Sequence, residues 1–151
     1  MLDTVAIRDL LKKDKRTRTS FRGVFACDEL PEQSPTSSLY IINTDPASRP
    51  GKHWVAVYIT SQRYGEYFDS FGMHTTVERI ESFLNKNCIR WQCNTKHVQD
   101  LLSDACGYHC IFYSVHRCIG FNLQAIINMY TNDSLFNDAI VKAFVRDYMI
   151  H

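Results

Sequence analysis

Two alternating segments in the middle of the chain constrain its fold more than any other feature. Residues 54–60 and 64–70 are rich in β-branched and aromatic side chains, and only residues 61–63 separate them. Such runs with a short connection predict an antiparallel β-hairpin. A hairpin brings its first and last residues to the same edge of the sheet. We therefore expect His53, just before the first strand, to lie near Asp69 at the end of the second.

The segments around this hairpin predict further strands and several helices. Residues 39–42 form a short apolar run and residues 89–93 alternate, so both are expected to be strands. We expect a single α+β domain over residues 1–151. Apolar positions at helical spacing predict a short helix near the N-terminus and helices near 76–86, 122–130 and 135–149, the last with an apolar stripe of Phe136, Ile140, Ala143, Phe144 and Tyr148.

Another helix is expected over residues 105–118, and its start is the important part. Ser103 or Asp104 can cap it, which places Cys106 in the first turn. The positive end of the helix dipole stabilises a thiolate at such a position. The expected architecture is a small mixed sheet, carrying the hairpin, packed on a central helix that begins at Cys106.

These residue types are the parts that a thiol hydrolase needs. His53 is the candidate base for the Cys106 thiol, and Asp69 is the candidate that orients the imidazole ring. Attack of a thiolate on a carbonyl creates an oxyanion, which needs hydrogen-bond donors already in place. The backbone N–H of Cys106 and the side-chain amide of Gln99, seven residues upstream, are the candidates. Gly107 is expected to leave room for a substrate to approach.

Each candidate also has a plainer interpretation. His53 can be a surface or core histidine, Asp69 a turn residue, and Gln99 a polar loop residue. Cys106 can be a small buried apolar group, as we expect for other cysteines of the chain. The presence of all four in compatible contexts favours the catalytic interpretation.

Composition restricts the setting in which this chemistry takes place. The chain has six cysteines and no basic-then-apolar leader at its start, which predicts reduced thiols rather than a disulfide framework. No apolar run approaches membrane-spanning length, so we expect a soluble, intracellular protein with no membrane partner. We expect no metal, because no Cys-x-x-Cys pair is present. The disfavoured alternative is a structural zinc held among Cys88, Cys93, His97, His109 and Cys110.

The ordered set of residues resembles the adenovirus-type endoprotease (adenain) family, which also occurs in Maverick or Polinton elements. That family lies within the clan of ubiquitin-like-protein proteases. His53 and its following tryptophan match the family's His-Trp, and Cys106 between alanine and glycine matches its Ala-Cys-Gly. Asp69 stands where adenoviral members have Glu and the ubiquitin-like-protein proteases have Asp. Gln99 precedes Cys106 by the family spacing, and the resemblance runs from about residue 20 onward.

The resemblance implies an adenain-like fold and a cysteine endopeptidase that cleaves viral or mobile-element precursor proteins, such as capsid proteins. For a viral member, the host nucleus or the virion is the implied location. Cys88, followed by isoleucine as in adenoviral members, is implied to hold an activating peptide through a disulfide, and an ordinary strand-end thiol is the alternative. Adenoviral members also use DNA as a cofactor. The basic stretch Lys12–Arg22 is the candidate DNA site, with a solvated surface as the alternative.

Two other functions compete with the endopeptidase. The first is a deconjugase of ubiquitin-like modifiers, which would use the same four residues on a substrate ending in Gly-Gly. The second is a catalytically inactive module that binds nucleic acid through residues 12–22. The complete set of catalytic residue types argues against the second.

Overall fold

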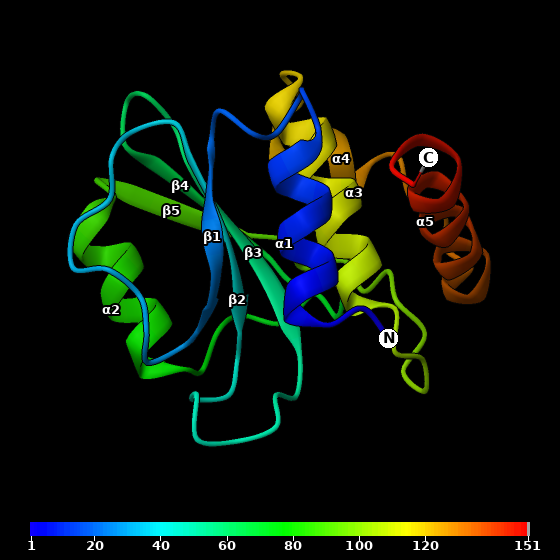
Figure 1. The fold of residues 1–151 in the computed structure, drawn as a ribbon, viewed down its shortest axis with the longest axis horizontal. Helices are drawn as coiled ribbons and strands as arrows, with labels where there is room; N and C mark the ends of the chain where they lie inside the picture. The colour runs from blue at the N-terminus through cyan, green and yellow to red at the C-terminus, as the bar shows by residue number, and fades with distance from the viewer. Residues whose placement is uncertain (151) are drawn as a thin grey trace.

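The computed structural model describes residues 1–150 as a five-stranded mixed sheet with helices on both faces. Helix α2 covers one face, α1 and α3 cover the other, and α5 packs outside α3 (Figure 1). The expected α+β fold is confirmed. The elements in chain order are α1 (Thr4–Lys13), β1 (Phe21–Ala26), β2 (Ser38–Asn43), β3 (Trp54–Ile59), β4 (Tyr64–Phe68), α2 (Glu78–Asn87), β5 (Arg90–Cys93), α3 (Cys106–Cys118), α4 (Leu123–Ile127) and α5 (Ser134–Tyr148).

The sheet has the strand order β1-β2-β3-β4-β5. Strand β3 is antiparallel to both of its neighbours, β2 and β4, whereas β1 runs parallel to β2 and β5 runs parallel to β4. The predicted hairpin is β3–β4, with Ala56 opposite Phe68 and Ile59 opposite Gly65. This register places the residue before β3 and the residue after β4 at one edge of the sheet.

Side chains of β2 alternate between two apolar cores. Leu39 and Ile41 pack with α1 and α3, while Tyr40 and Ile42 pack with α2. Fully burying a side chain of this size contributes roughly 1.5–3 kcal/mol. The continuous apolar run therefore reflects a strand that is covered on both faces. Among residues 1–150, no helix has the length and apolar content that a bilayer span requires.

The helices expected near 76–86 and over 105–118 both exist, but neither has a side-chain cap at its start, so the cap predicted for α3 is wrong. Helix α2 begins at Glu78 without a side-chain cap, because the Thr75 hydroxyl accepts the Val77 N–H and closes a turn before the helix. Helix α3 follows Ala105, and neither Ser103 nor Asp104 caps it. No side chain in the described part of the chain caps this end of α3, so its first-turn N–H groups are not taken up by a capping residue.

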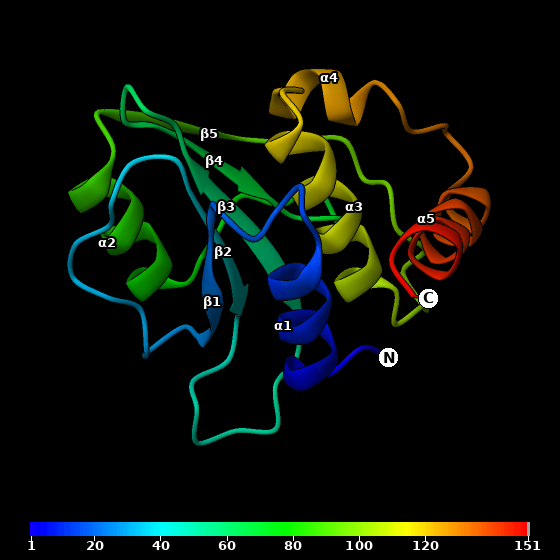
Figure 2. The same cartoon turned by 45° about the horizontal axis from the view of Figure 1, so that its top comes forward.

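Helix α5 turns a different face inward from the one its apolar stripe suggests. Its buried residues are Asn137, Asp138, Val141 and Val145. The stripe residues Phe136, Ile140 and Tyr148 are exposed by 51%, 45% and 62%. Two polar side chains therefore face α3 and the loop before it, where Figure 2 shows the helix lying.

Candidate active site

His53 and Asp69 meet at the end of the sheet where β3 begins and β4 ends. His53 immediately precedes β3 and Asp69 immediately follows β4. The Nε2 atom of His53 lies 2.7 Å from Oδ1 of Asp69, and the two side chains are only 14% and 8% exposed. A buried ionic hydrogen bond of this length is stronger than one in water. The hairpin thus gives the histidine a fixed partner.

Neighbouring groups hold both members of this pair in place. The Phe71 N–H donates to Oδ1 of Asp69 at 2.9 Å, and Asn94 exchanges two hydrogen bonds with the Asp69 backbone. The Phe71 ring stacks on the His53 ring with centroids 4.8 Å apart and planes 20° apart. Asp69 is therefore a turn residue whose carboxylate also bonds His53, so the plainer interpretation of Asp69 does not exclude the functional one.

Cys106, the candidate nucleophile, is the first residue of α3 and is buried, with 4% exposure. Because Asp69 occupies Nε2 of His53, Nδ1 is the ring nitrogen left for the thiol. Burial raises the pKa of Cys106, but hydrogen bonds from His53 and from the Trp54 and Gly107 N–H groups outweigh it and lower the pKa below its usual value. Burial lowers the pKa of His53, but its bonds to Asp69 and Cys106 raise it to about 9. The lowered pKa of Cys106 and the raised pKa of His53 both favour the thiolate–imidazolium form of the pair, compared with an isolated cysteine and histidine.

Cys106 differs in this respect from the other cysteines. Burial raises the pKa of each of the other thiols, to about 11 for Cys88 and Cys118. The others with a raised pKa are Cys27, Cys93 and Cys110. All six are free thiols. Cys106 is therefore the one cysteine whose pKa is lowered, and His53 contributes most to that lowering.

Gln99 is buried upstream of α3 with its amide orientation fixed. Its Oε1 accepts the Ser70 hydroxyl, while Nε2 donates to the backbone oxygen and the hydroxyl of Ser103 at 3.0 and 3.2 Å. The donor end of the amide therefore faces the segment that leads into α3. No hydrogen bond joins Gln99 to Cys106 within residues 1–150, so the structure brings His53, Asp69 and Cys106 into one chain of contacts and leaves Gln99 beside it.

Gly107 does not serve the purpose expected from the sequence. It is buried, and a Cβ there would lie 3.2 Å from the Leu2 Cβ, 3.3 Å from the Ile7 Cδ1 and 3.4 Å from the Trp54 Cδ1. The Trp54 indole N–H in turn donates to the Leu2 carbonyl at 3.2 Å. The glycine thus makes room for the N-terminal segment and the tryptophan, not for a substrate.

Cys88, the candidate peptide anchor, follows the last residue of α2 and is half-buried. A Cβ on Gly65 would lie 2.6 Å from its Sγ, so the sulfur is directed toward β4. With a pKa of about 11 it is a neutral thiol at pH 7. Its disulfide with an activating peptide stays a prediction.

The basic stretch Lys12–Arg22 ends α1 and continues into β1. Arg16 pairs with Asp14 at 2.7 Å and Arg22 donates to the Ser38 hydroxyl at 2.9 Å. The remaining cations, Lys12, Lys13, Lys15 and Arg18, are exposed. Four positive charges are therefore open to solvent, and binding of DNA to them stays a prediction.

The residues of the alternative zinc site serve other contacts. His109 is buried between Asp138 and Tyr130, and Cys88 packs toward Gly65. Within residues 1–150 no three His, Cys, Asp or Glu side chains form a group that can hold a metal ion. Sequence reasoning overlooked the His109–Asp138 pair, which no local pattern signals, and Phe71, which lies in the motif around Asp69.

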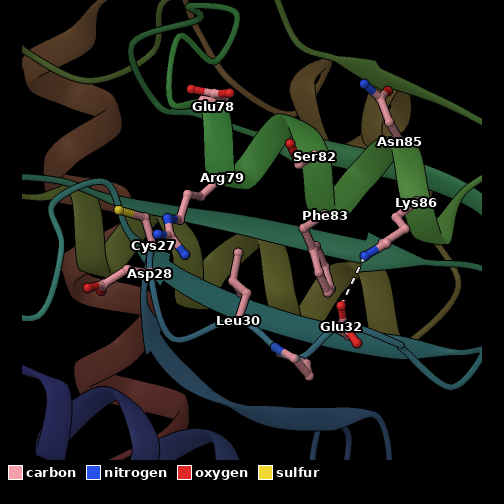
Figure 3. A pocket seen from close by; sticks show the side chains of 11 residues that line it. Cys27, Asp28, Leu30, Glu32, Glu78, Arg79, Ser82, Phe83, Asn85 and Lys86 are labelled. Atoms are coloured by element: carbon pink, nitrogen blue, oxygen red, sulfur yellow. Dashed lines mark hydrogen bonds and ion pairs between the residues drawn. The ribbon is translucent and has the colours of Figure 1, made fainter.

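A pocket of about 810 Å³ lies away from this site, between α2 and the segment after β1 (Figure 3). Glu32 and Lys86, which lie 3.2 Å apart, face each other across it. It is lined by Cys27, Asp28, Leu30, Pro31, Glu32, Glu78, Arg79, Ser82, Phe83, Asn85 and Lys86. None of the four candidate catalytic residues lines this pocket, so its volume has no direct part in their chemistry.

A thiol at a helix start, bonded to a histidine that a carboxylate orients, is the arrangement of thiol hydrolases. Comparison with known proteins finds similarity to proteases. No family model matches the chain. It is 27% identical over 126 residues to the protease of ovine adenovirus D serotype 7, which covers 73% of this chain and 61% of the relative. It is 32% identical over 89 residues to the protease of bovine adenovirus 4, covering 48% and 43%.

A solved structure shares the fold. The ASFV pS273R protease superposes with a TM-score of 0.64 at 18% identity, over 93% of this chain and 66% of that one. The chain spans about three fifths of the first adenoviral relative and less than half of the second. The resemblance to adenovirus-type proteases, and the fold that it implies, are confirmed.

Proposed function

We propose that this chain is a cysteine endopeptidase in which Cys106 is the nucleophile, His53 the base and Asp69 the orienting carboxylate. One observation carries the proposal: of six cysteines, only Cys106 has a lowered pKa, and the group that lowers it most is His53, whose ring is held by Asp69. The protease relatives support the same reaction class.

The reaction follows from these contacts. His53 takes the Cys106 proton, and the thiolate sulfur bonds to the scissile carbonyl carbon, whose π electrons move to the oxygen. When the carbonyl re-forms, the C–N bond breaks and His53 gives its proton to the leaving amine. A water molecule, deprotonated by His53, then attacks the thioester and releases the carboxylic acid and the Cys106 thiol.

Gln99 is the proposed second donor to the oxyanion, beside the Cys106 N–H. Support comes from its fixed amide, whose Nε2 faces the segment before α3. The uncapped start of α3 supplies the backbone donor. Removing one such donor typically lowers kcat by roughly 10²- to 10³-fold.

The proposed substrates are viral or mobile-element precursor proteins, including capsid proteins, processed in the virion or the host nucleus. The adenoviral proteases among the relatives support this substrate class. We also propose activation by a peptide bound through Cys88 and by DNA bound at the exposed lysines of Lys12–Arg22. Cleavage rates with and without each activator, in Cys88→Ser and Lys12→Ala/Lys13→Ala variants, test these two roles separately.

The test of the main proposal is cleavage of candidate capsid precursors by Cys106→Ala. We expect no cleavage, an unchanged circular dichroism spectrum, and full activity in the matched Cys118→Ala variant on the same helix. Cleavage by Cys106→Ala would show that the nucleophile is wrong. If precursors stay intact but a ubiquitin-like modifier with a C-terminal electrophile labels Cys106, the site belongs to a deconjugase.

A further inference from the structure

A second buried hydrogen-bond network lies behind the nucleophile helix. His109, one turn after Cys106, is fully buried and has partners on both ring nitrogens. Its Nε2 lies 2.7 Å from Oδ1 of Asp138, and its Nδ1 lies 3.0 Å from the Tyr130 hydroxyl. Burial lowers the pKa of His109 against the opposing effect of Asp138, so the ring is neutral near pH 7. Tyr130 therefore donates to Nδ1, and Nε2–H donates to Asp138.

The network continues from α5 to the loop that carries Gln99. The second oxygen of Asp138 accepts the Asp100 N–H at 3.3 Å. The adjacent Asn137 donates from Nδ2 to the Val98 carbonyl at 3.1 Å. Two consecutive side chains of α5 thus hold the residue before and the residue after Gln99.

The other side of the same loop is held by the segment that follows β4. The N–H groups of Val98 and Gln99 both donate to the Ser70 carbonyl, at 2.9 and 3.1 Å. Ser70 directly follows Asp69. The Gln99 backbone is therefore clamped between the histidine–carboxylate edge of the sheet and α5.

The orientation of α5 is the second reason to assign this network a role. The helix has an apolar stripe, yet Phe136, Ile140 and Tyr148 are exposed, and Asn137 and Asp138 are buried. Burying a carboxylate costs desolvation energy, and a well-packed apolar pair is often at least as stabilising. The buried polar face of α5 is therefore no more stabilising than an apolar one would be, and its hydrogen bonds reach the two neighbours of Gln99.

We propose that Asn137 and Asp138 are positioning residues that fix the Gln99 loop relative to the start of α3. The inference rests on the proposed function, because it gives Gln99 an oxyanion to stabilise. Misplacing a catalytic group by about 1 Å can cost roughly 10²-fold in rate. The two residues thus act on the reaction through Gln99 and do not touch the substrate.

The experiment compares acyl transfer with simple alkylation of Cys106. Peptide cleavage needs the oxyanion donors, whereas alkylation by iodoacetamide needs only the thiolate. In Asp138→Asn we expect kcat to fall roughly 10- to 100-fold with KM unchanged, while the alkylation rate and its pH midpoint stay at parent values. Asp147→Asn is the matched control, because Asp147 lies on the exposed side of the same helix, and it should behave as the parent.

A double-mutant cycle tests whether the effect of Asp138→Asn on cleavage acts through Gln99. We expect Asp138→Asn to cause no further loss in a Gln99→Ala background. If Asp138→Asn does not fold, Asn137→Asp is measured in its place. It keeps the acceptor for the Thr131 N–H and loses the donor to the Val98 and Thr131 carbonyls. Equal losses in cleavage and alkylation, or losses that add to that of Gln99→Ala, would overturn the inference. An active Gln99→Ala variant would instead overturn the proposed oxyanion role.

Discussion

Replacing Asp69 by asparagine removes a charge from the site with little change of shape. The pKa of His53 is about 9 in the structure, against an ordinary value of 6.5. At about 1.4 kcal/mol per pKa unit, the imidazolium is stabilised by roughly 3 kcal/mol. Asp69 and Cys106 share this stabilisation. Because His53 is largely buried, solvent screens little of it. Losing most of this stabilisation of the imidazolium corresponds to a fall in kcat/KM of about 10²-fold.

The pKa of His53 sets the pH at which activity is lost on the alkaline side, and Asp69→Asn should move this limit to lower pH. The imidazolium–thiolate pair exists above the pKa of Cys106 and is lost as the pH rises through the pKa of His53. The parent should therefore lose activity near pH 9, and Asp69→Asn should lose it at a lower pH. The assay is peptide cleavage from pH 5 to 10, with the exposed Asp9→Asn as control. An alkaline limb that stays near pH 9 in Asp69→Asn would refute the role assigned to the carboxylate.

Three further predictions concern the surroundings of the pair. Gly107→Ala should lower the free energy of unfolding by about 1–3 kcal/mol in urea titrations, because the new Cβ presses on Trp54 and the N-terminal segment; an unchanged midpoint would contradict this packing. Phe71→Ala should lower kcat about 3- to 10-fold in steady-state cleavage, since it removes the ring stacked on His53; a change in KM alone would point to substrate binding instead. Iodoacetamide at one equivalent and pH 7 should label Cys106 before any other cysteine in peptide mass spectra; preferential labelling elsewhere would contradict the pKa order.

Features with a local signal were predictable from the sequence. The alternation of residues 54–60 and 64–70 fixes a hairpin, and hairpin geometry alone brings His53 toward Asp69. The helix expected over residues 105–118 is also present and begins at Cys106, although the cap from which its start was predicted is absent. Such patterns depend on neighbours within a few residues, so they can be recognised without knowledge of the tertiary structure.

Features that depend on distant segments were not predictable. Ser103 does not cap α3 because its hydroxyl and carbonyl bind Gln99. Gly107 faces Leu2, which is more than a hundred residues away in the chain. The buried face of α5 is set by Asp138 meeting His109 and the Gln99 loop. In each case a long-range polar or steric contact outweighs the local preference.

The central claim is that Cys106 forms a covalent bond to the acyl part of the substrate. It is tested most directly by acid-quenching a reaction with a peptide ester and locating the acyl group by mass spectrometry. We predict a thioester on the peptide that contains Cys106, absent in His53→Ala under the same conditions. Cleavage that proceeds with the acyl group on another cysteine, or on none, would contradict the assignment.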